Sequence, residues 1–138
     1  MSQVTVTKLV EGESMLLVRV DLLSDGSGEL VNQVIISPSD LIPARPNNRP
    51  TFRIYQLWYG LVWFDAVLGF GTLQPMAVWT IARDCDSHND FRSFGGILDY
   101  ATVPPSDENG KLWISTNGFA PAGSQGTIVI ELRKTNAP

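Results

Sequence analysis

The densest cluster of side chains that could do chemistry covers residues 84–90, with the sequence DCDSHND. Oxygen ligands at alternate positions are typical of the start of a calcium-binding loop. An EF-hand loop beginning at Asp84 would need glycine at its sixth position and glutamate at its twelfth, where this chain has Asn89 and Gly95. The pattern therefore favours a solvated polar loop between strands, with a generic acidic ion site as the second interpretation.

The same segment holds the only cysteine of the chain, Cys85, and its only histidine, His88. Two ligands do not complete a zinc site, and their spacing in a loop does not fix a nucleophile against a base. We therefore interpret His88 as a loop residue that makes hydrogen bonds, and we expect no metal and no cofactor. A single cysteine also excludes an internal disulfide bond.

Asp65 is the carboxylate whose neighbours predict burial, because it lies in the apolar run at residues 61–70. Burial without a partner would raise its pKa and disfavour its charged form. Asp65 is then either a general acid that works with a second carboxylate such as Asp99, or a structural group that pairs with an arginine or faces a subunit boundary. The structural interpretation is favoured. Since the chain contains no nucleophile-elbow, metalloprotease or phosphate-binding motif, we expect no enzyme.

The four tryptophans are candidates for recognition. Trp58, Trp63 and Trp79 lie in apolar strands, which predicts a place in the core or in an interface. Trp113 alternates with two inward-facing aliphatic residues, which predicts an outward side chain. An exposed tryptophan on a β-sandwich either stacks on a sugar ring or anchors a protein interface, and the sequence leaves both open.

The elements that must position these residues are strands, because apolar residues repeat with a period of two and almost nothing repeats at 3.6. The predicted strands lie at residues 16–23, 30–36, 52–59, 61–70, 76–83, 111–115 and 128–133, with a further candidate at 5–10. About eight short strands separated by turn signals predict an all-β fold, a sandwich or barrel. Residues 37–43 fit one helical turn capped by Ser37.

Two hairpins are predicted from the turns. Residues 16–23 and 30–36 flank the tight turn at 25–28, and residues 111–115 and 128–133 flank a glycine-rich turn region. The strand at 61–70 is apolar on both faces, although one face normally meets water. Its second face is therefore covered by a loop, by the edge of the other sheet or by another subunit, and an isologous homodimer is the prediction.

Length and charge limit the remaining classes. The 138 residues make one domain spanning 1–138, in which residues 1–8 are a candidate extended N-terminal arm. Charged residues are only 17% of the chain, so apolar or aromatic surface is expected to meet a partner. The net charge is −4 and the lysines and arginines do not cluster, so no nucleic-acid partner is expected. No signal peptide or membrane span is expected either.

Five stretches of the chain carry a family resemblance: KLVEGES at 8–14, LSDGSGEL at 23–30, LWYGLVWFD at 57–65, DFRSFGG at 90–96 and GKLWISTNGF at 110–119. Together they resemble the small cement, or decoration, proteins that coat the heads of tailed bacteriophages. The likeness runs from about residue 8 to residue 134 and includes no site motif, so it assigns no individual binding residue.

This resemblance implies a jelly-roll-like antiparallel β-sandwich that binds the outside of a phage capsid and reinforces joints between major capsid protein subunits. The expected partners are the major capsid protein and a second copy of the chain. The candidate capsid contacts are residues 2–7, the proline-rich crossover at 44–50 and the loop at 84–90. The candidate interface residues are Trp63, Asp65, Val67, Trp113, Arg45 and Arg49. The alternative function is a non-catalytic carbohydrate-binding module that uses Trp113.

Overall fold

The computed structural model describes residues 2–44, 51–71, 76–84, 86–97, 110–119 and 121–134. They form nine strands and two short 3-10 turns, η1 (Pro38–Asp40) and η2 (Arg92–Phe94). Neither helical turn is long or apolar enough to cross a membrane. The all-β prediction is confirmed.

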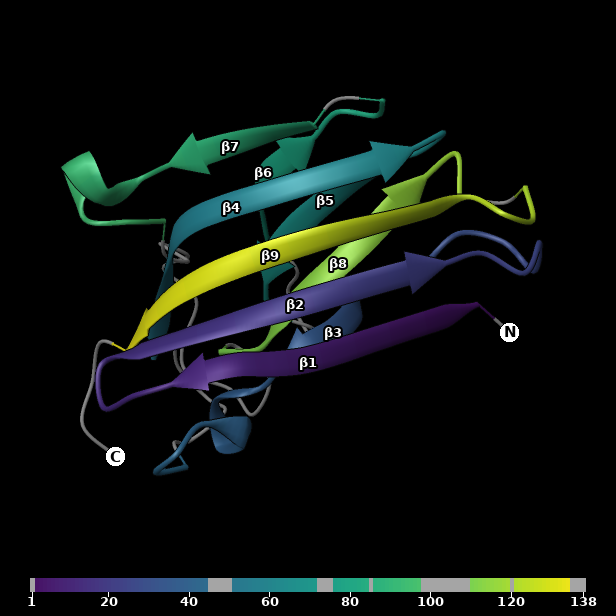
Figure 1. Ribbon diagram of the computed structural model, residues 1–138. Helices are drawn as coiled ribbons and strands as arrows, with labels where there is room; N and C mark the ends of the chain where they lie inside the picture. Colours follow the sequence, from purple (N-terminus) through teal and green to yellow (C-terminus); the bar gives the residue numbers. More distant parts are fainter. Residues whose placement is uncertain are drawn as a thin grey trace.

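Two antiparallel sheets pack face to face (Figure 1). The front sheet in that view has five strands in the order β1 (Gln3–Glu11), β2 (Met15–Leu23), β9 (Gln125–Lys134), β4 (Phe52–Val62) and β7 (Asp86–Asp90). The sheet behind it has four, in the order β3 (Gln33–Ile36), β8 (Leu112–Asn117), β5 (Asp65–Phe70) and β6 (Met76–Ile81).

The strand pairing is nested around the β5–β6 hairpin. Moving outward along the chain in both directions, β4 pairs with β7, β3 with β8 and β2 with β9. A long antiparallel ribbon folded over in this way into two sheets is the jelly-roll arrangement, and β1 extends one sheet beside β2. The fold is therefore a jelly-roll-like antiparallel β-sandwich, as predicted.

The core lies between the sheets and follows the period-two alternation of the strands. On β2, the inner side chains Leu16, Val18, Val20 and Leu22 are almost fully buried. Large aromatic side chains fill the centre, and Phe64 meets Phe119 edge-on with ring centroids 4.7 Å apart.

Both predicted hairpins are wrong. The strand that begins at Gln33 does not return beside β2 but crosses to the other sheet, where it pairs with β8. Likewise β8 and β9 lie in different sheets. A tight-turn sequence favours chain reversal, but it does not determine whether the reversed chain joins the same sheet or the opposite one.

The predicted strand at residues 61–70 is also wrong as one element. β4 ends at Val62, the chain turns at Trp63 and Phe64, and β5 starts at Asp65 in the second sheet. Because the run changes sheets, its alternation does not define two continuous faces. The sequence argument for a subunit contact over its second face therefore fails.

Two polar or terminal segments turn out to be strands. Residues 3–11 form β1, paired with β2 along its length, which confirms the candidate strand at 5–10 and places residues 3–8 of the candidate extended arm in an edge strand. Within the predicted loop at 84–90, residues 86–90 form β7, paired with β4. A polar segment can occupy a sheet edge because backbone hydrogen bonds hold it and its side chains face water.

The predicted helical turn near Ser37 is confirmed as η1, where the Ser37 N–H donates to an Asp40 carboxylate oxygen at 3.0 Å. Most of the predicted crossover at 44–50, including Arg45 and Arg49, lies outside the described residues, as do Cys85 and Asp99.

Candidate functional site

The candidate interface residues of the sequence converge partly on the turn between β4 and β5, which we call the Trp63 turn (residues 62–65 with Arg83 and Asp84). Here the chain leaves the five-stranded sheet and enters the four-stranded one. Trp63 lies at the turn with 57% of its surface exposed. Trp63 is therefore not part of the core. Of the two predicted places for it, core or interface, only the interface stays a prediction.

The backbone of Trp63 is strained. Its φ angle is +74°, a left-handed conformation that costs a non-glycine residue about 1–2 kcal/mol. Asp84 holds it there: the Trp63 N–H donates to the Asp84 carboxylate at 2.9 Å, and the Asp84 N–H donates to the Leu61 carbonyl at 2.8 Å. Asp84 has a positive φ itself, +57°. The strained Trp63 is thus held by Asp84, a residue type that adopts the left-handed conformation more readily, and strain of this kind is concentrated at functional sites.

Arg83 joins the turn to its neighbours. Its guanidinium donates to both carboxylate oxygens of Asp65, at 3.3 and 3.0 Å, and its backbone N–H donates to the same group at 2.7 Å. Further guanidinium N–H groups donate to the carbonyl of Trp63 at 3.5 Å and to that of Asn117 at 3.3 Å. The ends of β4, β6 and β8 are thereby held together around one side chain.

The charges at this turn compensate each other. Hydrogen bonds from Arg83 hold the pKa of Asp65 below its ordinary value, and the same contact raises the pKa of Arg83. Asp65 is therefore a charged structural group paired with an arginine, as the favoured interpretation predicted. It is half-buried, and its lowered pKa is the opposite of what a general acid needs.

The surroundings of Trp63 leave little room for change. At Gly118, with φ +90°, an added Cβ would lie 2.9 Å from an Arg83 nitrogen and 3.0 Å from the Trp63 carbonyl oxygen. Val62 and Leu23 are exposed apolar side chains at this end of the five-stranded sheet. The result is a solvent-exposed indole on a backbone that hydrogen bonds hold in place.

The other candidate interface residues are elsewhere. Val67 lies on the outer side of the second sheet, half-buried and opposite Thr80 and Ser115. The prediction for Trp113 is wrong, because only 4% of its surface is exposed. It does lie on the side of the strand opposite the core, as alternation predicts, with Gly69 as its neighbour on β5, but the outer side of the sheet is covered at Trp113. Alternation predicts on which side of a sheet a residue lies, but not how exposed its side chain is.

The polar residues of the predicted ion loop do not converge. Asp84 binds the Trp63 N–H, Asp90 forms an ion pair with Arg92 at 2.6 Å, and His88 lies on the strand beside Gln56. Among the described residues no three His, Cys, Asp or Glu side chains gather as metal ligands would. His88 does make a hydrogen bond, as predicted, but from a strand and not from a loop.

Two features of the site were not predicted. Arg83 and Asp84 follow the last residue of a strand and have no motif, so nothing in the sequence indicated that they would organise a turn twenty residues earlier. The stacking of Trp58 on His88, with ring centroids 4.9 Å apart, depends on the pairing of β4 with β7 and was missed for the same reason.

Comparisons with known proteins give little more than the fold. No family model matches the chain, and no curated protein matches it at a significant level. It is similar to a cupin superfamily protein from Desulfitobacterium hafniense DCB-2, with a TM-score of 0.32 and 8% identity over 97% of this chain and 79% of that one. It is also similar to HppE in its Fe(II) form, with a TM-score of 0.31 and 10% identity over 94% of this chain and 56% of that one. At these TM-scores neither likeness carries an argument about activity.

Proposed function

We propose that this chain is a structural virion protein that binds the outer surface of a tailed-phage capsid and reinforces contacts between major capsid protein subunits. The observation that carries the proposal is the exposed, strained Trp63. A large aromatic side chain on a fixed backbone is the kind of group that contributes most to a protein interface.

The support is both local and global. Two of the stretches that resemble decoration proteins, 57–65 and 110–119, meet at the Trp63 turn, where Arg83 bonds to Asp65, to the Trp63 carbonyl and to the Asn117 carbonyl. A turn already fixed before binding loses little conformational entropy when a partner packs on it. The jelly roll supplies a rigid frame for that turn, and jelly rolls serve both capsid and lectin domains.

Self-association is part of this proposal, but we place the contact between the two copies at the edge strand β1 and not over residues 61–70. β1 is the longest strand at a sheet edge, nine residues against five, four and six in β7, β3 and β6. An unpaired edge offers backbone donors and acceptors to a second copy, and a two-fold contact there would continue the five-stranded sheet. Sedimentation should give twice the chain mass of 15.2 kDa, and a monomer at micromolar concentration would remove the dimer from the proposal.

The experiment for capsid binding uses phage particles that lack the protein. Wild-type protein added to them should co-sediment at saturable occupancy, and Trp63→Ala should weaken this binding by about tenfold or more. Trp58→Ala is the matched control, since it removes another exposed indole, one that lies on β4 outside the turn, and it should bind as wild type. Equal binding by Trp63→Ala and wild type would contradict the role of the turn.

A further inference from the structure

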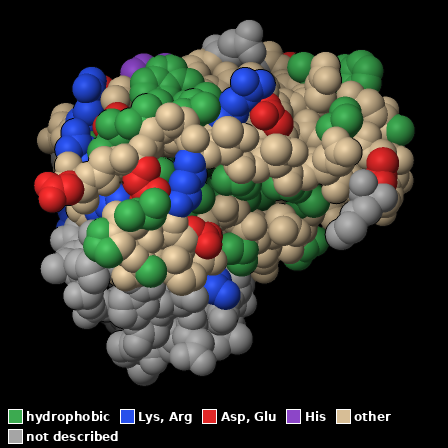
Figure 2. All heavy atoms as spheres, turned by 60° about the horizontal axis from the view of Figure 1, so that its bottom comes forward, with side chains coloured by type: hydrophobic (Ala, Val, Ile, Leu, Met, Phe, Trp, Pro, Cys, Tyr) green, Lys and Arg blue, Asp and Glu red, His purple; other side chains and the backbone are tan. Residues whose placement is uncertain are grey.

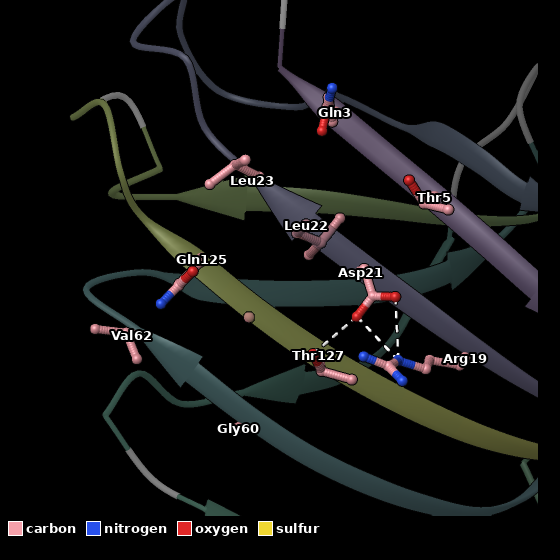
Figure 3. A pocket seen from close by; sticks show the side chains of 11 residues that line it. Gln3, Thr5, Arg19, Asp21, Leu22, Leu23, Gly60, Val62, Gln125 and Thr127 are labelled. Carbon is pink, nitrogen blue, oxygen red and sulfur yellow. Dashed lines mark hydrogen bonds and ion pairs between the residues drawn. The ribbon is translucent and has the colours of Figure 1, made fainter.

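The outer face of the five-stranded sheet is hollowed along its middle. One hollow of about 520 Å³ lies over β1, β2, β9 and β4 (Figure 3), and a shallower one of about 370 Å³ lies beside Trp58 and Val129. The two share the short residues Gly60 and Thr127 and are therefore adjacent on this face, and we call them together the groove. Each hollow is within the size range of small-ligand sites.

The first hollow is lined by hydrogen-bonding groups. Gln3 and Thr5 reach it from β1, and Gln125 and Thr127 from β9 (Figure 3). Amides and hydroxyls both donate and accept hydrogen bonds, so this lining can match a ligand with many hydroxyl groups. Leu23 and Val62 add apolar surface at one end.

The charges in the groove cancel. Arg19 and Asp21 form an ion pair at 3.1 Å, and the Thr127 hydroxyl donates to the same carboxylate at 2.9 Å (Figure 3). No other charged side chain lines either hollow among the described residues. A strongly charged ligand would therefore meet no opposite net charge in the groove. A neutral polar ligand needs none, because it can bond to the amide and hydroxyl groups of the lining.

The second hollow has an aromatic wall that is held in place. Trp58 stacks on His88 with an angle of 8° between the ring planes, and it is 37% exposed. His88 Nε2 lies 2.8 Å from Gln56 Oε1, and Gln56 donates its amide to the buried Glu131. Since a carboxylate only accepts, this arrangement requires the proton on His88 Nε2. Figure 2 shows the purple histidine next to hydrophobic side chains at the edge of the molecule.

We propose that this groove binds a neutral polysaccharide chain. The apolar face of a sugar ring packs on Trp58, and hydroxyl groups of neighbouring sugar units bond to Asp21, Thr127 and Gln125. A groove with no net charge, with amide and hydroxyl groups and with an aromatic wall, fits a sugar chain better than it fits an apolar protein surface. The inference does not depend on capsid binding, and the residues proposed to contact the sugar are not part of the Trp63 turn, which shares only Val62 with the groove.

The test measures binding of maltohexaose, cellohexaose, xylohexaose and mannohexaose to the full chain by calorimetry and tryptophan fluorescence. At least one should bind at millimolar concentration or below. Trp58→Ala should weaken that binding by about tenfold or more. Gln125→Ala, at an exposed position where folding is not at risk, should weaken it severalfold.

Trp63→Ala is the control, because it removes an exposed indole that lines neither hollow, and it should bind the sugar as wild type does. Absence of binding by all four sugars would overturn the proposal. So would sugar binding that Trp58→Ala leaves unchanged. A dimer that Trp58→Ala converts to monomer, without sugar binding, would instead assign the face to a second copy. If Trp58→Ala loses sugar binding and still binds phage particles normally, the sugar groove and the capsid contact rest on different residues, so the two proposals can fail independently.

Discussion

At the scale of single residues, Trp63 combines an exposed apolar side chain with an unfavourable backbone, and neither helps the fold. An exposed indole contributes little burial energy, and a left-handed φ costs about 1–2 kcal/mol. Asp84 and Arg83 hold this state with hydrogen bonds to the backbone on both sides of the indole. The arrangement makes sense if the indole has a partner, because the cost is then offset on binding.

The strain can be measured with two variants at this position. Trp63→Gly removes both indole and strain, whereas Trp63→Ala removes the indole and keeps a Cβ at φ +74°. We expect the glycine variant to be more stable by about 0.5–1 kcal/mol, because relief of strain exceeds the extra freedom of glycine in the unfolded chain. Urea unfolding of both proteins gives the difference. A glycine variant less stable than the alanine variant would show that the turn is not strained.

Of these residue-scale features, only the pairing of Asp65 could be predicted from the sequence. Asp65 was correctly expected to pair with an arginine, because a charge in an apolar run needs a partner, but the partner could have been any of the arginines. The positive φ at Trp63 has no sequence signal, since turns of this type usually contain glycine or asparagine. Trp113 was wrongly expected to be exposed, because the alternation within its own strand does not indicate what covers the outer side of the sheet.

At the scale of elements, a buried ion pair joins β1 to β9 and to the segment after η1. The Lys134 ammonium, 1% exposed, donates to Glu11 at 2.8 Å and to the carbonyls of Gly12 and Ile42 at 2.8 and 2.9 Å. Glu11 also accepts from Lys8 at 3.0 Å and from the Ile42 N–H at 2.8 Å. Nearly every hydrogen-bonding position of both groups is used, which is what burial of such a pair requires.

Removing one partner of this pair should be costly. Lys134→Met leaves the Glu11 carboxylate largely buried without its main counter-charge, and we expect a loss of about 3 kcal/mol in the free energy of unfolding. Lys8→Met removes a more exposed lysine from the same carboxylate, and its cost should not exceed about 1 kcal/mol. Denaturant midpoints measure both. Equal effects of the two substitutions would contradict the account of this ion pair.

The same carboxylate makes stability depend on pH. Burial by itself would raise the pKa of Glu11, but hydrogen bonds from Lys134, the Ile42 N–H and Lys8 outweigh it and lower the pKa from 4.5 to about 2. A lowered folded-state pKa stabilises the protein fully above the unfolded value, and this stabilisation disappears as the pH falls from about 4.5 towards 2. The stability difference between wild type and Glu11→Gln should therefore shrink over that range. A difference that stays constant from neutral pH to pH 2 would contradict the lowered pKa.

Sequence predicted most strands but not their partners. Period-two alternation identified β2, β4 and β9, where one face meets the core. It missed β7, whose side chains are polar and whose place is set by backbone pairing with β4. It also joined β4 to β5, because core residues continue through the turn: Leu61 and Phe64 are both buried on either side of Trp63. Alternation in the sequence shows which residues are buried. It does not show a change of sheet, because residues on both sides of that change are buried.

At the scale of the whole molecule, the jelly roll brings together residues that are distant in the chain. Nested pairing places β9 between β2 and β4, so Asp21, Thr127 and Gly60 become neighbours across the groove. It also brings the ends of β4, β6 and β8 to the Trp63 turn. One end of the sandwich thus carries the proposed capsid anchor, and the outer face of one sheet carries the proposed sugar groove.

The direct test of reinforcement is the temperature at which phage particles release their genome, with and without this protein on the shell. A protein that binds only assembled subunits stabilises the shell by mass action, so saturating amounts should raise the release temperature. Trp63→Ala should raise it much less at the same concentration, and Trp58→Ala should act as wild type. The same release temperature for bare and saturated particles would contradict the proposal that this protein reinforces a capsid.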